Sequence, residues 1–123
     1  MNRLVLFPLL CYTFSMKPEY QLPYCVYVLL SLKDDNFYVG YTTDLPRRLD
    51  EHFQGRNTST APRRSFVLVH CEYYLAKADA ERRENYLKTA KGRRVLRLML
   101  QDSLTQARNR AEGSGAGAPR SQN

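Results

Sequence analysis

The sequence predicts a small α/β domain in which a three-stranded antiparallel sheet is flanked by helices. Three short runs rich in β-branched and aromatic residues, at 24–31, 36–41 and 66–74, are typical of strands. Only a polar turn separates the first two runs, so we expect them to form a hairpin. Segments with apolar residues at helical spacing follow the second and the third run. We therefore expect one helix between the last two strands and two helices after them.

Composition limits the size of the domain and the kind of partner. The 123 residues suffice for one domain, and 19 Lys and Arg against 12 Asp and Glu give a net charge of +7. Most of the basic residues are arginines, which bind phosphate through two hydrogen bonds, so the charge favours nucleic acid as a partner. Three cysteines without metal-ligand spacing indicate neither a structural zinc site nor a disulfide framework, and fit a reducing cytoplasmic compartment.

Residues 1–23 form an N-terminal extension before the predicted domain. An apolar run at 4–14 resembles the core of a signal peptide, but it lacks a small-residue cleavage site and is too short to span a bilayer. Translation from Met16 is one alternative, and it would leave only a short polar lead. An extra packed strand and a membrane-directed segment are the others. We expect no membrane partner for the domain itself.

The predicted hairpin carries one tyrosine on each strand, Tyr27 and Tyr38. Because side chains alternate across a strand, pairing through the polar turn can place both phenols on the same face of the sheet. Gly40 lies inside the second strand, where a glycine suggests a bulge or the close approach of another group to the main chain.

The first predicted helix, at 44–54, begins at Asp44, which suits an N-cap, with a proline in its first turn. Its apolar residues recur at intervals of four and form the expected buried stripe: Leu45, Leu49 and Phe53.

Two polar residues, Arg48 and His52, lie along this stripe, whereas Arg47 points the other way. The structural alternative is that the arginine and the histidine lie at a helix edge with their polar ends in water, and that the tyrosines are ordinary strand residues.

A polar segment at 54–65 follows, and we expect a loop. It carries three arginines that are candidates for binding a phosphate backbone, and a solvated loop is the equal alternative: Arg56, Arg63 and Arg64. The third strand is apolar on both faces, which favours the central position in the sheet. His70 on this strand is expected to be a hydrogen-bonded structural residue rather than a ligand or base.

Two further helices are predicted at 76–91 and 93–108, with Gly92 as the C-cap of the first. Glu84 falls at the margin of the buried side of the first of these helices. A carboxylate there needs a partner, and an ion pair with Arg83 is the structural alternative to a metal ion.

The basic residues of these helices are further candidates for nucleic-acid binding, together with Arg47: Lys88, Lys91, Arg93 and Arg94. The folded domain is expected to occupy residues 24–109. The remaining segment, 110–123, is rich in Gly, Ala and Ser without an apolar period, and we expect it to be disordered.

The order of the candidate residues resembles that of the GIY-YIG nuclease superfamily. The residues that carry the resemblance are Tyr27 within Val26-Tyr27-Val28, the run Tyr38-Val39-Gly40, Arg48, His52 and the run Arg83-Glu84-Asn85-Tyr86. The resemblance spans residues 24–100 and is strongest to small stand-alone members, which are related to the N-terminal domain of a component of the ABC excinuclease.

This resemblance implies a metal-dependent endonuclease that hydrolyses phosphodiester bonds in DNA, with repair or recombination as the expected setting. Glu84 would hold Mg²⁺ or Mn²⁺, and Arg48 would contact the scissile phosphate. Tyr27 or Tyr38 would orient or deprotonate the attacking water, and His52 would assist the proton transfer. A phenol with a pKa of about 10 is a poor base at neutral pH, so a nearby cation must lower that pKa. No small-molecule cofactor is implied.

Two other functions remain open at this point. One is a nucleic-acid-binding module that kept the fold and turns over little or nothing, and the other is a protein-binding domain whose positive charge serves solubility. Members of the superfamily often carry an asparagine well after the glutamate, and this chain has none between Asn85 and Asn109. A lone domain of this type is also expected to rely on a partner protein for its choice of target.

Overall fold

The computed structural model describes residues 18–54 and 65–120, with the backbone alone at 114–120. The elements in chain order are the 3₁₀ helix η1 (Pro18–Tyr20), β1 (Tyr24–Ser31), β2 (Phe37–Thr42), α2 (Leu45–Phe53), β3 (Phe66–Tyr74), α3 (Lys77–Leu87), α4 (Ala90–Met99) and α5 (Gln101–Arg120).

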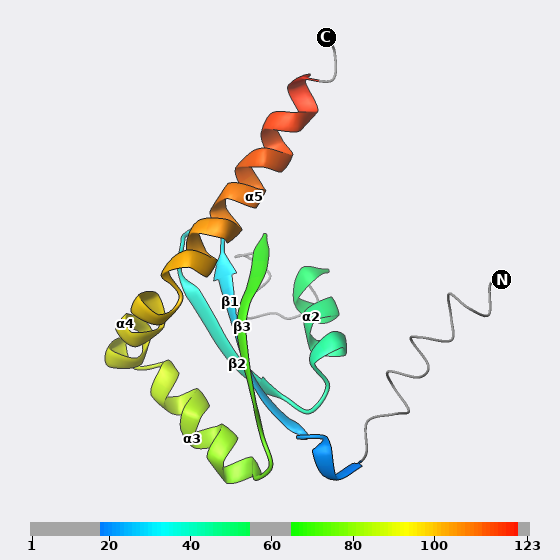
Figure 1. Ribbon diagram of the computed structural model, residues 1–123, viewed down its shortest axis with the longest axis vertical. Helices are drawn as coiled ribbons and strands as arrows, with labels where there is room; N and C mark the ends of the chain where they lie inside the picture. The colour runs from blue at the N-terminus through cyan, green and yellow to red at the C-terminus, as the bar shows by residue number, and fades with distance from the viewer. Residues whose placement is uncertain (1–17, 55–64, 121–123) are drawn as a thin grey trace, which may run out of the picture.

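The three strands form one antiparallel sheet between two layers of helix, which confirms the expected fold class. Helix α2 covers one face, and α3, α4 and the start of α5 lie against the other (Figure 1). Aliphatic residues of β1 and β2 pack against α3, α4 and α5, whereas the α2 face is richer in aromatic residues. No helix in the part of the chain that the structure describes is long and apolar enough to cross a membrane.

The central strand is β1, not β3, because the sheet has the order β2-β1-β3. All residues of β1 except Tyr24 are buried, whereas most of β3 is only partly buried. The expectation that β3 is central was therefore wrong. An edge strand can also carry apolar residues on both faces when helices cover both of its faces, so composition alone did not distinguish the two positions.

A β-bulge in β3 changes which residues share a face. Val28 pairs with His70 and Leu29 pairs with Leu68, so Val69 has no partner on β1. Because of this extra residue, the side chains beyond Val69 point to the face opposite to the one that strict alternation from Phe66 would give. His70 therefore lies on the α3 side of the sheet instead of sharing a face with Leu68.

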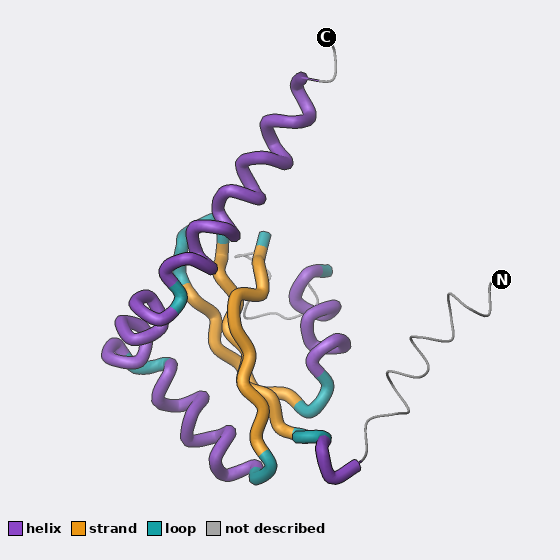
Figure 2. Tube along the Cα trace, viewed as in Figure 1, coloured by secondary structure: helices purple, strands orange, loops and turns teal. Residues whose placement is uncertain are grey.

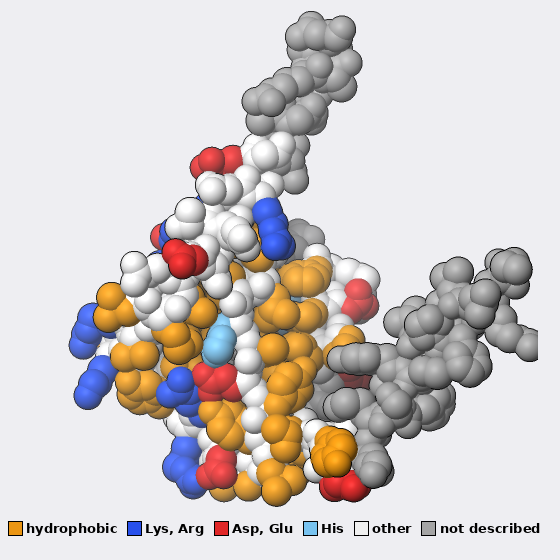
Figure 3. Space-filling model, in the orientation of Figure 1, with side chains coloured by type: hydrophobic (Ala, Val, Ile, Leu, Met, Phe, Trp, Pro, Cys, Tyr) orange, Lys and Arg blue, Asp and Glu red, His pale blue; other side chains and the backbone are white. Residues whose placement is uncertain are grey.

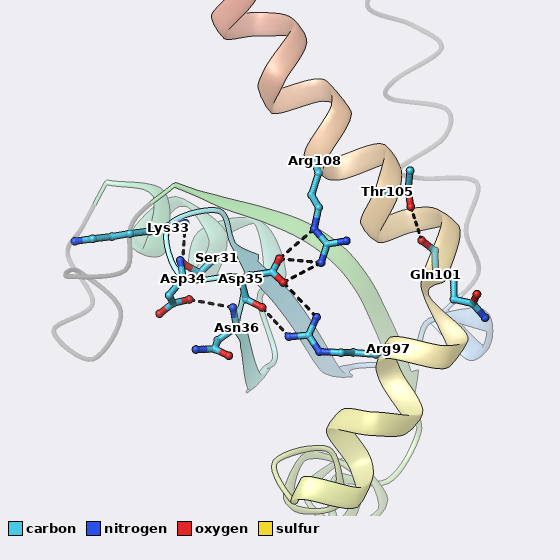
Figure 4. Close-up of polar contacts among 9 residues, drawn as sticks. All are labelled: Ser31, Lys33, Asp34, Asp35, Asn36, Arg97, Gln101, Thr105 and Arg108. Carbon is cyan, nitrogen blue, oxygen red and sulfur yellow. Dashed lines mark hydrogen bonds and ion pairs between the residues drawn. The ribbon is translucent and has the colours of Figure 1, made fainter.

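The β1–β2 turn is bound to the C-terminal helices through Asp35 (Figure 4). This residue adopts a positive φ of 61°, which aspartate tolerates better than most residues. Arg97 of α4 donates to the backbone oxygen of Asp35 at 2.6 Å, and Arg108 of α5 donates to its carboxylate at 2.8 and 3.1 Å. The guanidinium of Arg97 also lies 4.7 Å from the centre of the Phe37 ring. One turn thus fixes both helices on the sheet.

Helices α3 and α4 meet at Gly92, which is not the expected C-cap. The side chain of Thr89 accepts a hydrogen bond from the Gly92 amide at 3.0 Å and caps the start of α4. A Cβ atom on Gly92 would lie 2.1 Å from the backbone oxygen of Tyr86. Glycine is therefore required by the close approach of two helices rather than by the end of one.

The last helical segment differs from the expected single helix at 93–108. It is interrupted at Leu100, and α5 then continues to Arg120 and leaves the body of the domain (Figures 1 and 2). Leu104 and Ala107 are buried against the sheet, so the first part of α5 is packed. Glycine and proline are the poorest helix formers, and residues 110–120 contain three glycines and one proline. The composition of 110–120 therefore did not indicate its backbone structure.

Candidate active site

A buried pair of side chains, Tyr27 of β1 and His52 of α2, lies at the centre of the site. Both are fully buried, and the Tyr27 hydroxyl lies 2.8 Å from Nε2 of His52. The Tyr38 ring packs against His52 with 5.0 Å between ring centres, and the Phe66 ring lies 6.2 Å away. Tyr27 and Tyr38 thus share the α2 face of the sheet, as the sequence led us to expect.

Gly40 makes room for the Tyr27 ring. The two residues are paired directly across β1 and β2, and a Cβ atom on Gly40 would lie 2.3 Å from both Cζ and the hydroxyl oxygen of Tyr27. This confirms that a group approaches the main chain at Gly40, and it identifies that group as the candidate catalytic phenol. Any side chain at this position would displace Tyr27.

The buried stripe of α2 ends at His52 rather than at Phe53. Leu45 and Leu49 are partly buried on the sheet side, but Phe53 is 48% exposed at the last position of the helix. The stripe follows the spacing i, i+4, i+7, so the histidine occupies the place that the sequence assigned to phenylalanine. A buried imidazole is acceptable here because Tyr27 provides a hydrogen-bond partner.

The two adjacent arginines of α2 differ in exposure. The Arg48 side chain is 38% exposed and that of Arg47 is 77% exposed. Both lie close to the carboxylate of Glu51, at 3.2 Å for Arg48 and 3.6 Å for Arg47. Arg48 lies one helical turn before the buried His52, on the same side of α2, and its positive charge acts to lower the pKa of Tyr27. Glu51 was missed in the sequence, although its spacing of three and four residues from the arginines indicates such pairs.

The protonation states of the central pair follow from burial. Burial raises the pKa of Tyr27 above its ordinary value, the neighbouring Tyr38 adds to this, and the charge of Arg48 opposes it without prevailing. Burial also lowers the pKa of His52, and Arg48 adds to that effect. At neutral pH the phenol is therefore protonated and the imidazole neutral, so the Tyr27 hydroxyl donates to Nε2. The expectation that a nearby cation lowers the phenol pKa does not hold for Arg48 alone.

Glu84 of α3 is largely buried and is paired with a lysine. Its Oε2 atom lies 3.0 Å from Nζ of Lys88, one helical turn further on. Its negative charge adds to the raised pKa of Tyr27, after burial and the neighbouring Tyr38. The expected alternative, an ion pair with Arg83, was wrong, because Arg83 donates instead to Glu72 of β3 at 2.9 and 3.0 Å. Successive helical residues point about 100° apart, which separates Arg83 from Glu84.

A single carboxylate is compatible with magnesium or manganese. Among the described residues no three His, Cys, Asp or Glu side chains are grouped so that they could hold a metal ion. Magnesium keeps most of its water and binds through one or two carboxylates together with substrate phosphates. Glu84 therefore fits an ion whose coordination shell is completed by water and substrate, and it does not fit a metal that is held by protein ligands alone.

The remaining basic candidates fall into three groups. Lys91 and Arg94 are exposed on α4. Arg93 is partly buried and donates to the backbone oxygens of Lys88 and Phe37, so it holds α4 on the sheet. The third group lies outside the described residues: Arg56, Arg63 and Arg64.

A second polar cluster lies on the opposite face of the sheet, around Glu72. His70 lies 2.8 Å from the Glu72 carboxylate, which confirms that it is a hydrogen-bonded structural residue. Burial on its own raises the pKa of Glu72, but hydrogen bonds from Arg83, Tyr74 and His70 outweigh it and lower the pKa to about 2. This cluster joins β3 to α3 and is separate from the Tyr27–His52 pair.

Comparison with known proteins agrees with this geometry. A family model described as the GIY-YIG catalytic domain matches residues 23–97, which include all five candidate catalytic residues. The chain is 36% identical over 72 residues to a UPF0213 protein of Staphylococcus haemolyticus, covering 58% of this chain and 88% of that protein. It is 37% identical over 79 residues to one of Natronomonas pharaonis (63% and 92%) and 41% identical over 64 residues to one of Halobacterium salinarum (51% and 82%). No solved structure matches the chain.

Proposed function

This chain belongs to the GIY-YIG catalytic domain family, and we propose that it is a metal-dependent endonuclease that hydrolyses phosphodiester bonds in DNA. The family gives the chain a nuclease-type fold. The observation that carries the proposal is the hydrogen bond between Tyr27 and a neutral His52, with Tyr38 packed beside it. A buried phenol and imidazole in contact, on the side of Arg48, form a proton-transfer unit next to a phosphate-binding cation.

The central pair can take up a proton without forming a free phenolate. Because His52 is neutral, its Nε2 can accept the Tyr27 proton as the buried Tyr27 receives one that is relayed from the attacking water through the neighbouring Tyr38. Tyr38 is partly exposed, so its hydroxyl is the phenol that can orient a water molecule at the surface. The guanidinium of Arg48 stabilises the charge that develops on the phosphoryl oxygens. An Mg²⁺ or Mn²⁺ ion held by Glu84 would supply further stabilisation of that charge as a Lewis acid.

We propose that the exposed basic residues bind the DNA backbone, and these are Arg47, Lys91 and Arg94, with the arginines of the 55–64 segment. Lys88 joins this set when its pairing with Glu84 is exchanged for a phosphate. Each phosphate contact releases counterions, so affinity is expected to fall steeply with salt. A partner protein that selects the target fits a domain of this size.

A binding module with little turnover is the second candidate, and two observations favour it. The Tyr27 pKa is raised, and Glu84 is already paired with Lys88. Both features leave the site inactive unless substrate and metal change them. Such a module would show salt-dependent affinity for DNA without metal-dependent products.

The decisive experiment is a cleavage assay on single-stranded, duplex and branched DNA, with and without Mg²⁺ or Mn²⁺. Glu84→Gln removes the charge at constant shape and is expected to abolish cutting, while affinity for DNA stays the same or rises. Glu81→Gln, on the exposed side of the same helix, is the matched control and should cut like the wild type. Metal-dependent cutting by Glu84→Gln would remove this residue from the site.

The adjacent arginines provide a second matched pair. Arg48→Ala is expected to abolish cleavage with the fold intact, and Arg47→Ala should only weaken binding, because Arg47 points to solvent. Equal losses in the two variants would contradict the assignment. If the wild type forms no metal-dependent products on any substrate, the binding module becomes the better description.

A further inference from the structure

An open cavity with a mixed polar and apolar lining lies beside the candidate active site, at the end of the sheet where α2 begins. Its volume is about 590 Å³, and its apolar lining comes from the start of β1, the start of α2 and the end of β3: Leu22, Pro23, Leu45, Pro46 and Tyr73. Hydrophobic side chains gather along the face between β3 and α2 that leads to this end of the sheet (Figure 3). We call it the Tyr73 cavity.

The bulge in β3 places Tyr73 on the same face as the catalytic candidates. Tyr73 pairs with Cys25 across the sheet, and Cys71, two residues earlier, pairs with Tyr27. Tyr73 therefore lies diagonally across from Tyr27, on the same face of the sheet. Tyr73 is 46% exposed, so an aromatic ring that lines the cavity is open to solvent beside Leu22 and Leu45.

The charges around the cavity indicate what can enter it. No lysine or arginine among the described residues lines the Tyr73 cavity, and Asp44 contributes a carboxylate, which disfavours a phosphate. A smaller cavity shares Thr43 and Asp44 with it and is lined by two arginines, Arg47 and Arg48, beside Glu51. A phosphate is suited to the arginine-lined cavity, and a flat neutral group is suited to the tyrosine-lined one.

We propose that the Tyr73 cavity binds an unpaired nucleobase of the strand whose phosphate lies against Arg48. The inference rests on the proposed function and narrows its substrate class. Bases within a duplex are paired and stacked, so only a single-stranded or extruded nucleotide can reach Tyr73. The substrate is therefore DNA with at least one unpaired nucleotide beside the scissile phosphate.

The test measures binding without cleavage. A single-stranded oligonucleotide that carries 2-aminopurine, and a blunt duplex of the same sequence, are titrated in EDTA with the wild type, Tyr73→Ala, Tyr73→Leu and Tyr73→Phe. Loss of one stacked base is expected to weaken single-strand binding about ten-fold in the Ala and Leu variants. Tyr73→Phe keeps the ring and should bind like the wild type. Quenching of 2-aminopurine on binding should occur only with the wild type and the Phe variant.

The controls separate stacking from folding and from catalysis. Leu75→Ala changes an exposed apolar residue just beyond β3 that does not line the cavity, and it should leave binding unchanged. Equal weakening on single strand and duplex, or a Tyr73→Leu variant that binds and quenches like the wild type, would overturn the inference. Because the readout is made without metal, it holds or fails independently of cleavage. A wild type that cuts DNA but shows no effect of Tyr73 substitution would contradict this inference alone.

Discussion

The two faces of the sheet differ in what holds them to their helices. On the α3 side, Val26, Val28 and Leu30 of β1 pack against leucines of the helices, and the Glu72–Arg83 ion pair adds a polar contact only at β3. On the α2 side, the alternate residues of the same strand include Tyr27, whose hydroxyl is bound to a buried histidine. One central strand therefore carries the core on one face and the candidate chemistry on the other.

The residues that stabilise the fold and those that are candidates for the chemistry thus lie on different faces of the sheet. A buried aliphatic contact resists change because any smaller residue leaves a cavity. A buried polar pair adds less net stability, but it fixes the orientation of both groups and leaves their protons available. Substitutions on the two faces should therefore affect unfolding and cleavage to different degrees.

Leu96→Ala tests the aliphatic face and should have the largest effect on stability. Leu96 is fully buried, so its truncation is expected to lower the free energy of unfolding by about 2–5 kcal/mol. Urea denaturation followed by circular dichroism measures this. Leu98→Ala, on the same helix but 71% exposed, should change it by less than about 0.5 kcal/mol. Comparable losses in the two variants would show that α4 is not packed as described.

Acid should weaken the two faces at different pH. The pKa of Glu72 is about 2 in the folded state and 4.5 as the ordinary value, so its contribution of about 3 kcal/mol is present above pH 4.5 and lost as the pH falls toward 2. The pKa of His52 is lowered from 6.5, so the unfolded state is protonated first and stability already falls below pH 6.5.

Urea midpoints measured across these two windows, with Glu72→Gln as the comparison, check the assignment. The Glu72→Gln protein should be less stable at neutral pH and should lose much less stability between pH 4.5 and 2. If Glu72→Gln loses as much stability over this pH range as the wild type, other carboxylates control the acid transition.

Tyr27→Phe tests the polar face and should have an intermediate effect. It removes the donor to His52 and keeps the ring above Gly40, so the cost is that of one unsatisfied buried group, about 1–3 kcal/mol. Cleavage should be lost far more completely than stability. Tyr38→Phe is the control, because this partly exposed phenol should cost little stability when its hydroxyl is removed. Full cleavage by Tyr27→Phe would remove the pair from the mechanism.

Asp35→Asn should have the smallest effect on stability, and it tests a contact of the β1–β2 turn that belongs to neither face. It keeps a side chain that tolerates positive φ and weakens the exposed contacts with Arg97 and Arg108, so we expect less than about 1 kcal/mol in global stability. Faster amide hydrogen exchange in α5, with β1 unchanged, is the expected local result. Unchanged exchange in α5 would show that burial of Leu104 and Ala107 alone holds the helix.

The strands, and the positions of several candidate site residues within their elements, could be predicted from the sequence because local chemistry determines them. Aromatic and β-branched runs specified the hairpin, and helical spacing separated Arg48 from Arg47. Gly40 was identified as a point of close approach from its place within a strand, and the group that approaches it is Tyr27.

The features that could not be predicted depend on contacts between distant segments. The central position of β1 depends on which strands pair, and the partner of Arg83 lies on β3 rather than on its own helix. The role of Gly92 depends on how closely α3 and α4 approach, and the break at Leu100 depends on packing against the sheet. The bulge at Val69 left no signal in composition, because valine is an ordinary strand residue.

The bulge at Val69 also determines where the chain can change its length. Val28 and Leu29 are consecutive on β1, and their partners on β3 are separated by this single residue. Removal of Val69 would leave regular pairing, with Tyr73 still toward α2 and Glu72 still toward α3. Removal of His70 would have the same result with Val69 opposite Val28, whereas removal of Cys71 would place His70 opposite Tyr27 on the α2 face. Among related chains, a strand that is one residue shorter at Val69 or His70 is therefore compatible with both faces.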